Sequence, residues 1–531
     1  MAQKYDVIVI GGGHNGLVSA AYLARAGKKV LVLERRHVLG GASVTEEIFP
    51  GFKFSVCSYV VSLLRPEIIR DLDLPRHGLE ILPLDGTMTP MPNGDYLWRM
   101  NDHGRTVREI RRHSKLDAEA YEEFSQAMVH MCRFVKPILG MVPPDPTKVK
   151  WGDLQKLLFL GKRFRDMKYE DQYNMVQLMT MSATDFLDQW FETDVLKATM
   201  SASGIIGTFL GVRSPGTAYV LLHHYMGEID GTFRAWGLPR GGTGGISNAI
   251  ASAAREAGVE IRTEAPIVRI LTKNERAIGV ALKSGEEIYA EYVSTSLDPR
   301  LSFTKLMDPK ELPGDFIAGV NHYKFRGSSG KVNLALDALP DFTCMPGPGA
   351  HLRGAISISP SVEYMERAYD DAKYGRFSRR PYCDIVIPSL TDPSVAPPGK
   401  HTMSCFVQYA PFKLAADQGT WDDQKEAFGD AVIDTISQYA PNLKKIILHR
   451  QVVTPLDLER EFGLSEGNIF QGELSLEQLF FLRPVAGWAR FRTPIKNLYM
   501  CGSATHPGGG IMGGPGRLAA LEMLKDMGVS A

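Results

Sequence analysis

Several features that define other classes of protein are absent from this sequence. Its 60 Lys and Arg residues balance its 60 Asp and Glu residues, so no basic excess points to nucleic acid as a partner. Its six cysteines are scattered and form no C-x-x-C pair, which argues against structural zinc and a redox-active disulfide. This cysteine usage favours a reducing compartment, here the cytoplasm. No run of about 18 apolar residues occurs, so no membrane-spanning helix is expected.

Motifs for metals and for nucleophilic catalysis are also missing. No cluster of His, Cys, Asp and Glu has metal-ligand spacing, and no catalytic triad or kinase signature can be assembled. We therefore expect no metal site. A strand already begins at Tyr5, which predicts no cleavable leader. The chain is long: 531 residues, 44% of them apolar, suffice for two or three domains or one interleaved α/β unit.

The strongest motif lies near the N-terminus. An apolar run at residues 7–10 indicates a buried parallel strand, and the fingerprint Gly11, Gly13, Gly16 follows at once. Gly11 permits a tight turn, Gly13 lets a pyrophosphate approach the backbone, and Gly16 lets the next helix pack closely on the strand. The first turn of that helix offers unpaired N–H groups to a diphosphate. The alternative is a βαβ unit with a glycine-rich turn that binds no dinucleotide.

A second strand ends at Glu34, which is 18 residues beyond Gly16. At about this offset a carboxylate meets the ribose hydroxyls of a dinucleotide. Arg36 and the pair Gly40-Gly41 follow, where the backbone again has to come close to a ligand. The cofactor contacts predicted from this segment are Gly11, Gly13, His14, Asn15, Gly16, Glu34, Arg35, Arg36, Gly40, Gly41, Ala42 and Ser43.

The second glycine pair distinguishes between two dinucleotides. An NAD site does not need it, because that cofactor is bound mainly by the first turn. Here the sequence resembles the two-dinucleotide-binding-fold flavoproteins, whose R-x-x-x-G-G motif embraces FAD. The resemblance implies FAD as the cofactor, and it implies that backbone groups near Val268 hold the adenine.

A glycine-rich segment at residues 241–245 opens another helix. No apolar strand precedes it, so it is not a second dinucleotide fingerprint, and we expect no separate NAD(P)H domain. The flavin then has to exchange electrons with a diffusible acceptor, such as a quinone or oxygen.

The C-terminal segment carries the second strong signal. A strand at residues 497–501 runs into a small-residue loop at 502–510 and then into a helix. A helix N-terminus can stabilise a reduced flavin, and the loop can approach the ribityl chain and phosphates. The contacts predicted from this segment are Gly502, Ser503, Met512 and Gly513.

The phrase T-H-P-G in this loop resembles the C-terminal FAD motif of phytoene dehydrogenase and related carotenoid oxidoreductases. The W-G-x-P-x-G-G segment that begins at Trp236 extends the resemblance to the middle of the chain. Segments L-R-P-E-I-I near residue 65 and H-P-G-G-G-I-M-G-G-P-G-R at the end are most similar to one branch of this family. The resemblance implies an apolar, polyene-like substrate.

These signals together predict an α/β two-dinucleotide-binding-fold flavoprotein. Its Rossmann-like FAD domain is expected to be discontinuous, formed by residues 1–75, 236–306 and 483–531. An α+β substrate domain is expected from residues 76–235 and 307–482. Residues 79–100 predict two hairpins of this domain, with turns at Asp85-Gly86 and Asn93-Gly94.

Three residues are candidates for catalysis. His506 lies in the C-terminal FAD motif and is the leading acid/base candidate, although it could instead brace the loop by hydrogen bonding. His224 and Tyr225 lie in a mostly apolar stretch, so each of them either closes a local hydrogen bond or faces a cavity.

The first functional hypothesis is an FAD-dependent oxidoreductase that moves a hydride at a C–C bond of an apolar small molecule. A flavin-bound regulatory protein with little turnover, a flavin-dependent isomerase and an amine oxidase remain open.

The segment at residues 151–169 is amphipathic. Its apolar cluster at 157–160 lies just before Lys162, Arg163 and Arg165, a combination that suits peripheral contact with an anionic membrane surface. The alternatives are a helix that covers the core and a contact in a homo-oligomer. These two interpretations are favoured over membrane contact.

Overall fold

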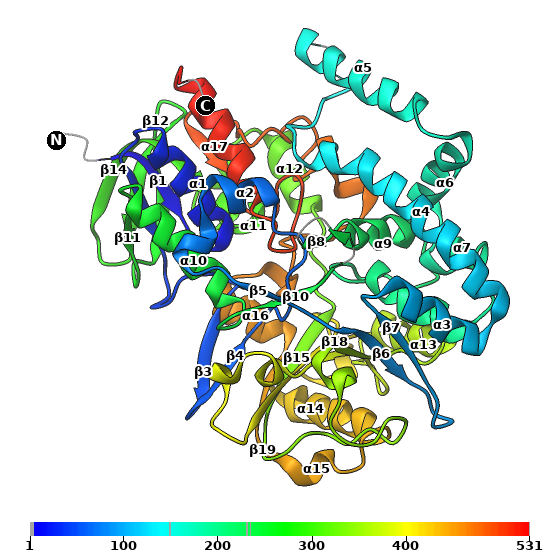
Figure 1. Ribbon diagram of the computed structural model, residues 1–531. Coiled ribbons are helices and arrows are strands. Elements are labelled where there is room, and N and C mark those ends of the chain that lie inside the picture. The colour runs from blue at the N-terminus through cyan, green and yellow to red at the C-terminus, as the bar shows by residue number, and fades with distance from the viewer. Residues whose placement is uncertain (1–4, 148–149, 230–231, 234, 530–531) are drawn as a thin grey trace.

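The computed structural model describes residues 5–147, 150–229, 232–233 and 235–529. A parallel sheet forms the upper left part of the molecule in Figure 1. Its strands lie in the order β11-β2-β1-β14, and β20 pairs with the far side of β14. These strands are β1 (Tyr5–Ile10), β2 (Val30–Leu33), β11 (Glu260–Arg262), β14 (Glu287–Thr295) and β20 (Leu498–Met500). β1 and β2 are almost entirely buried apolar runs, as expected for a sheet that is covered on both faces.

Three helices cover one face of this sheet, and they come from three distant parts of the chain. They are α1 (His14–Arg25), α10 (Gly244–Glu256) and α17 (Gly514–Asp526). The other face is covered by an antiparallel meander, in which β12 (Ile267–Lys273) and β13 (Arg276–Leu282) pair with each other and with the first residues of β14. Helices α11 (Pro299–Thr304) and α12 (Gly314–His322) pack on the same side.

A second sheet forms the lower part of the molecule (Figure 1). Its order is β19-β15-β18-β17-β16-β6-β7, and every pair is antiparallel except β16 with β6. The strands are β6 (Gly86–Pro90), β7 (Tyr96–Met100), β15 (Ser329–Leu336), β16 (Ala355–Ile358), β17 (Tyr382–Val386), β18 (His401–Gln408) and β19 (Ile447–Val453). Helices α14 (Trp421–Ser437) and α15 (Leu443–Ile446) pack on one face, and α13 (Val362–Lys373) packs on the other.

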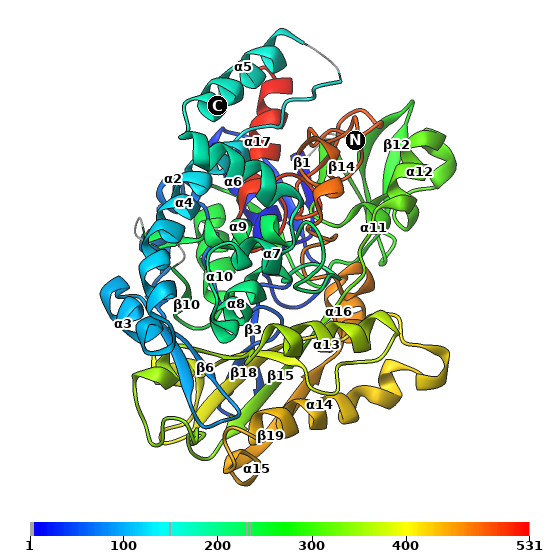
Figure 2. The same cartoon turned by 90° about the vertical axis from the view of Figure 1, so that its right-hand side faces the viewer.

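A layer of helices lies between residues 103 and 225 and shares one apolar core. Its members are α3 (His103–His113), α4 (Lys115–Leu139), α5 (Trp151–Arg165), α6 (Tyr169–Thr180), α7 (Ala183–Asp188), α8 (Asp194–Ser201) and α9 (Thr217–Tyr225). In both views α5 lies at the outer edge of the molecule (Figure 1, Figure 2). None of the helices in the described ranges is long and apolar enough to span a bilayer.

The structure confirms the predicted fold class, a Rossmann-like α/β unit joined to a substrate unit with its own sheet. One local prediction was wrong. Residues 79–100 form a single hairpin, β6 with β7, because β5 (Ile81–Pro83) pairs instead with β10 (Gly237–Pro239). The remaining elements are β3 (Thr45–Phe49), β4 (Phe52–Ser55), α2 (Pro66–Asp71), β8 (Glu228–Ile229), β9 (Thr232–Phe233) and α16 (Pro455–Phe462).

Candidate cofactor and substrate site

The turn after β1 depends on two glycines for steric reasons. Gly11 has a φ of +90°, and a Cβ on it would lie 2.5 Å from Ser296 Oγ. A Cβ on Gly16 would lie 2.2 Å from the carbonyl oxygen of Gly11. Both distances are far below van der Waals contact, so Gly11 lets the segment after β14 approach the turn, and Gly16 lets α1 approach β1 closely.

Gly13 is different, because nothing in the described protein crowds it. Its φ of −69° suits any residue, and a Cβ on it would meet only the Gly40 carbonyl oxygen, 3.9 Å away. The helix begins at His14 with no side-chain cap and no acidic residue in its first turn. The result is an open cradle lined by N–H groups, which a diphosphate fits and a Cβ would partly fill.

Glu34 lies at the same turn. Its carboxylate accepts hydrogen bonds from the Gly12 N–H at 2.8 Å and from the Arg36 N–H at 2.9 Å, and the residue is buried. Strand β2 therefore places the predicted ribose carboxylate beside the glycine turn. The Arg36 guanidinium pairs with Glu46 at 2.9 Å and still has a buried Nη1 with no hydrogen-bond partner among the described residues.

Of the other residues predicted from the first motif, Gly40 and Ala42 border the cradle, whereas the Ser43 hydroxyl bonds to a distant segment. Gly40 bridges to Gly13, and the Ala42 carbonyl oxygen accepts a hydrogen bond from Ser58 Oγ at 3.0 Å, so this segment borders the cradle. Ser43 is buried, and its hydroxyl donates to the Thr243 carbonyl oxygen at 2.8 Å.

Three predicted cofactor contacts differ from the others in where their side chains lie. Arg35 turns to the surface and donates to the Glu461 carbonyl oxygen at 2.6 Å. Val268 is a β12 residue with a half-exposed side chain, so a contact with adenine would have to use its backbone. His14 is partly buried, its Nε2 has no hydrogen-bond partner among the described residues, and burial lowers its pKa to about 4.

The two ends of the chain meet at this cradle. Asn15 Nδ2 donates to Ser503 Oγ at 3.0 Å, although 488 residues separate them. A Cβ on Gly516 would lie 2.1 Å from the Asn15 carbonyl oxygen, so α17 packs against the start of α1. Gly513 has a φ of +71° at the N-terminus of α17, and the neighbouring Met512 carbonyl oxygen accepts the Arg65 N–H. The structure thus brings Ser503 to the first motif.

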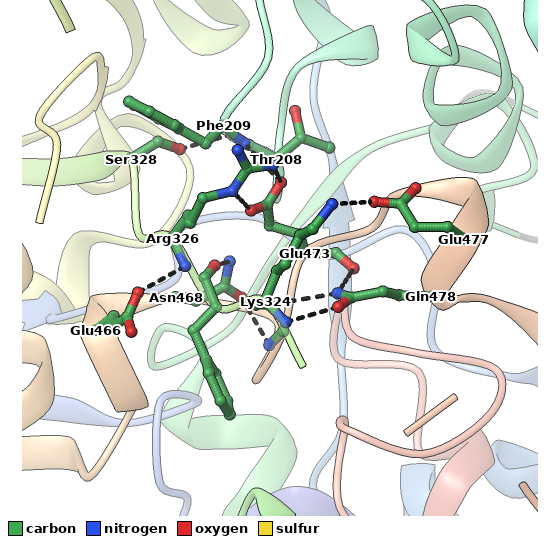
Figure 3. A network of polar contacts seen from close by, with 12 residues as sticks. Thr208, Phe209, Lys324, Arg326, Ser328, Glu466, Asn468, Glu473, Glu477 and Gln478 are labelled. Carbon is green, nitrogen blue, oxygen red and sulfur yellow. Dashed lines mark hydrogen bonds and ion pairs between the residues drawn. The ribbon is translucent and has the colours of Figure 1, made fainter. Parts of the chain in front are cut away.

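A polar network fixes the segment that faces the C-terminal loop. Figure 3 shows Arg326 paired with the fully buried Glu473, while Lys324 binds Glu477 and Gln478. Arg483, which is also fully buried, donates hydrogen bonds to five carbonyl oxygens. These oxygens belong to Phe470, Gly472, Glu473, Gln478 and Ser503. Arg483 therefore ties the loop that carries Ser503 to residues 470–478.

His506 braces this loop. Its Nε2 lies 2.9 Å from the Ile138 carbonyl oxygen, and a carbonyl only accepts, so Nε2 carries the hydrogen. Nδ1 then acts as an acceptor, and it is buried without a partner among the described residues. Burial lowers the His506 pKa to about 4, so the ring is neutral at physiological pH. His506 is not among the residues that line the cavity described next.

A cavity of about 220 Å³ lies between the helical layer and the second sheet. His224 and Tyr225 line it, which is one of the two alternatives that the sequence left open for them. His224 donates from Nδ1 to the Val220 carbonyl oxygen at 3.0 Å and stacks on Trp236 with ring centroids 6.2 Å apart. Burial lowers its pKa to about 4, so it too is neutral. Other apolar lining residues are Val60, Leu84, Met200, Ala202, Ile206 and Leu221.

The cavity also has a polar lining, which sequence reasoning missed. Tyr59 donates a hydrogen bond of 2.6 Å to Asp384, and both residues line the cavity together with Arg99. Burial raises the Asp384 pKa to about 6, while the Tyr59 hydroxyl and the positive charge of Arg99 lower it. These residues come from three distant segments, so no sequence spacing could reveal them.

Lys331 was also missed, although it leaves a trace in the sequence. It is the one charged residue in β15, a strand that is buried along its whole length. Its Nζ donates to the carbonyl oxygens of Ser55 and Ser58, the latter at 2.7 Å. Burial lowers its pKa to about 7. A lysine in an otherwise buried strand is a candidate functional group, because such a group is costly to bury.

The cradle and the cavity adjoin each other. Ser58 bonds to the Ala42 carbonyl oxygen at the edge of the cradle, and the next residue, Tyr59, lines the cavity. Ser58 and Tyr59 thus link the two sites. A dinucleotide in the cradle and a small molecule in the cavity would be separated by this short segment. Within the described ranges, no group of three or more His, Cys, Asp and Glu residues is placed to hold a metal ion.

These features define an FAD-dependent oxidoreductase. The family model described as flavin containing amine oxidoreductase matches residues 16–515, so the chain belongs to this family. FAD is its cofactor, as the two glycine motifs predicted. The glycine cradle, Glu34 and the loop at Ser503 are the groups placed to hold it.

The chain is also similar to individual proteins over nearly its whole length. The chain is 40% identical to pyridine nucleotide-disulfide oxidoreductase domain-containing protein 2 of Rattus norvegicus, over 99% of this chain and 94% of the relative. It is 28% identical to a limonene dehydrogenase subunit of Castellaniella defragrans, over 99% and 96%. It is 25% identical to prolycopene isomerase 1 of an Oncidium hybrid cultivar, over 99% and 85%. The resemblance to carotenoid oxidoreductases is therefore confirmed as a more distant one.

Solved structures agree on the fold. An oxidoreductase from Methanosarcina mazei superposes with a TM-score of 0.60 at 17% identity, covering 98% of this chain and 100% of the other. At this identity the likeness establishes the fold alone.

Proposed function

We propose that this oxidoreductase desaturates or saturates a C–C bond of a compact apolar molecule bound in the cavity beside Trp236. The observation that carries the proposal is the position of that cavity, which adjoins the FAD cradle through Ser58 and Tyr59. When bound, FAD supplies a hydride acceptor or donor at N5 of its ring. A diffusible quinone or oxygen is the proposed electron partner.

The protein's own residues orient the substrate and handle the proton. The apolar lining and the stacked pair of His224 and Trp236 exclude water from the substrate. The neutral His224 ring adds no charge to this lining. Asp384 has its pKa raised to about 6, so close to neutral pH it can accept a proton that leaves the substrate as the hydride departs. The Tyr59 hydroxyl positions this carboxylate.

The relatives support the substrate class. One relative is named for dehydrogenation of limonene and another for isomerisation of prolycopene, and both names point to unsaturated hydrocarbons. A cavity of about 220 Å³ favours a molecule nearer to limonene in size than to a long polyene, because pockets for drug-sized ligands begin at about 300 Å³.

Amine oxidation is the second candidate, and two observations favour it. The family model is named for amine oxidoreductases, and Asp384 places a carboxyl group in the cavity that could pair with an ammonium group. A flavin-dependent isomerase remains a third reading, supported by the name of the isomerase relative.

The test is anaerobic reduction of the bound flavin. Purified FAD-loaded protein is mixed separately with limonene, with a linear polyene and with putrescine, and bleaching of oxidised flavin is followed. Bleaching by the compact hydrocarbon supports the proposal, whereas bleaching only by the amine, with peroxide formed in air, supports amine oxidation. Photoreduced protein is then mixed with a quinone or oxygen. If it stays reduced with every acceptor and no substrate bleaches it, a binding role replaces the enzymatic one.

A further inference from the structure

An apolar surface lies on the helical layer, away from both sites. Six of the eleven large hydrophobic side chains that are exposed in the described ranges lie between residues 151 and 176. We call them the α5–α6 surface: Trp151, Leu158, Phe159, Tyr169, Tyr173 and Val176. Trp151 is 73% exposed and Leu158 is 63% exposed. Such clustering in a short stretch is unusual for a surface that faces only water.

The sequence left open whether α5 covers the core, and in the structure it does so only in part, through Phe164 and other partly buried residues. Asp153 is the one residue of α5 that is buried, and it pairs with Arg490 at 2.6 Å. Lys156 donates to the Val142 carbonyl oxygen at 2.9 Å. Polar contacts thus help attach α5 to the body, while Trp151, Leu158 and Phe159 stay exposed.

An apolar groove of about 310 Å³ opens between α4, α5 and α6. Leu157, Leu160 and Phe164 line it from α5, and Val176, which belongs to the α5–α6 surface, lines it from α6. Two further lining residues, Tyr219 and Phe480, have ring centroids 5.8 Å apart. The ring of Phe480 lies 6.3 Å from that of His506 in the C-terminal FAD loop. The groove therefore leads from the α5–α6 surface toward the FAD loop.

Basic residues accompany the apolar ones. Residues 150–171 hold six Lys and Arg against four Asp and Glu. Two of these four acids, Asp153 and Asp171, are buried and paired with Arg490 and His130. The surplus cations gather at the end of α5, where Lys162, Arg163 and Arg165 follow the exposed Leu158 and Phe159. Cations beside exposed aromatic and aliphatic side chains suit an anionic lipid surface.

We propose that the α5–α6 surface docks on an anionic lipid bilayer, with the apolar groove open toward the acyl chains. A two-fold contact with a second copy of the chain is the weaker reading, since it would set this same basic cluster against itself. The docking does not depend on the proposed reaction. If the substrate is apolar, the groove gives it a path from the bilayer toward the FAD loop.

The test uses the full FAD-loaded protein and sedimentation with vesicles. One set of vesicles is pure phosphatidylcholine, and the other contains phosphatidylglycerol as well. We expect binding to the anionic vesicles that weakens as salt is added. The double variant Leu158→Asp, Phe159→Asp should bind at least tenfold more weakly, and so should Lys162→Glu, Arg165→Glu. All four side chains are outside the core, so FAD content and melting temperature should stay unchanged.

The matched control is Tyr374→Asp, Leu448→Asp, which places the same charges on exposed apolar residues elsewhere. This variant should bind vesicles like the unmodified protein. Equal binding by both aspartate variants would overturn the proposal, as would the absence of binding to anionic vesicles. A dimer in sedimentation velocity that only Leu158→Asp, Phe159→Asp dissociates would also overturn it and assign the surface to a second copy.

Discussion

Gly13 and Gly16 belong to the same fingerprint, but the structure gives them different roles. Replacing each of them with alanine distinguishes a role in cofactor binding from a role in packing. A Cβ on Gly13 would have no described atom closer than 3.9 Å, and the backbone there has an ordinary φ of −69°. Gly13→Ala should therefore leave the FAD-free fold intact, or stabilise it by about 0.4–1 kcal/mol through the unfolded chain. It should weaken FAD binding by at least about 100-fold, or about 2.7 kcal/mol, because the methyl group occupies the diphosphate cradle.

Gly16→Ala should do the reverse. Its Cβ would lie 2.2 Å from the Gly11 carbonyl oxygen, about 1 Å inside normal contact, and neither backbone can rotate away. Alanine gains about 1 kcal/mol over glycine in a helix, but this clash of backbone with Cβ costs more. We expect a net loss of about 2 kcal/mol, with weaker FAD binding as a consequence of the shifted helix.

The two quantities are measured separately. Flavin is removed from each variant, the melting temperature of the FAD-free protein is recorded, and FAD is then titrated while its fluorescence is followed. The refuting results are specific. Unchanged FAD affinity in Gly13→Ala would mean that the diphosphate lies elsewhere, and an unchanged melting temperature in Gly16→Ala would mean that α1 does not pack on β1 as described.

Three further predictions rest on buried polar groups. In a double-mutant cycle of Asn15→Ala and Ser503→Ala, chemical denaturation should give a coupling energy of about 1 kcal/mol, and additive losses would contradict the contact. Because burial raises the Asp384 pKa to about 6, its stabilising contribution is present below its unfolded value of 3.8 and is lost as pH rises through 6. The stability of Asp384→Asn relative to the unmodified protein should therefore rise between pH 4 and pH 8, by at most about 3 kcal/mol, and a flat profile would contradict this. The Lys331 pKa is lowered to about 7, so its charge destabilises the fold below that pH and the penalty fades as pH rises toward 10.5. The relative stability of Lys331→Met should be highest near pH 6 and fall toward pH 9 in melting experiments; a rise would refute the lowered pKa.

The cofactor site could be predicted from sequence because each of its halves is local. Gly11, Gly16 and Glu34 lie within one βαβ unit, where chain geometry fixes their relation, and the structure places Glu34 at the glycine turn. Arg35 and Arg36 show the limit of this reasoning. They are neighbours in a motif, but one points to the surface and the other pairs with Glu46, and the motif does not distinguish the two directions.

The substrate cavity could not be predicted in this way. Tyr59, Arg99 and Asp384 meet through the pairing of distant strands and loops, and no spacing in the sequence encodes that meeting. The same reason explains the wrong hairpin. Residues 81–83 have the composition of a strand, but their partner is β10, which lies more than 150 residues further along the chain. Composition identifies a strand, whereas tertiary position selects its partner.

The cofactor site is complete only when the two ends of the chain have come together. The first motif supplies the cradle and Glu34, but Ser503 and the start of α17 arrive only when the last part of the chain folds back. Gly516 lies so close to the Asn15 carbonyl that no side chain fits between α17 and α1. The C-terminal helix therefore has to dock in one register for the cradle to close. Arg483 then links the same loop to residues 470–478, where Glu473 pairs with Arg326, three residues before β15 begins. The loop that carries Ser503 is thus tied through Arg483 and Glu473 to Arg326, which lies just before the second sheet, so substitution of Arg483 should disturb both the loop and this segment.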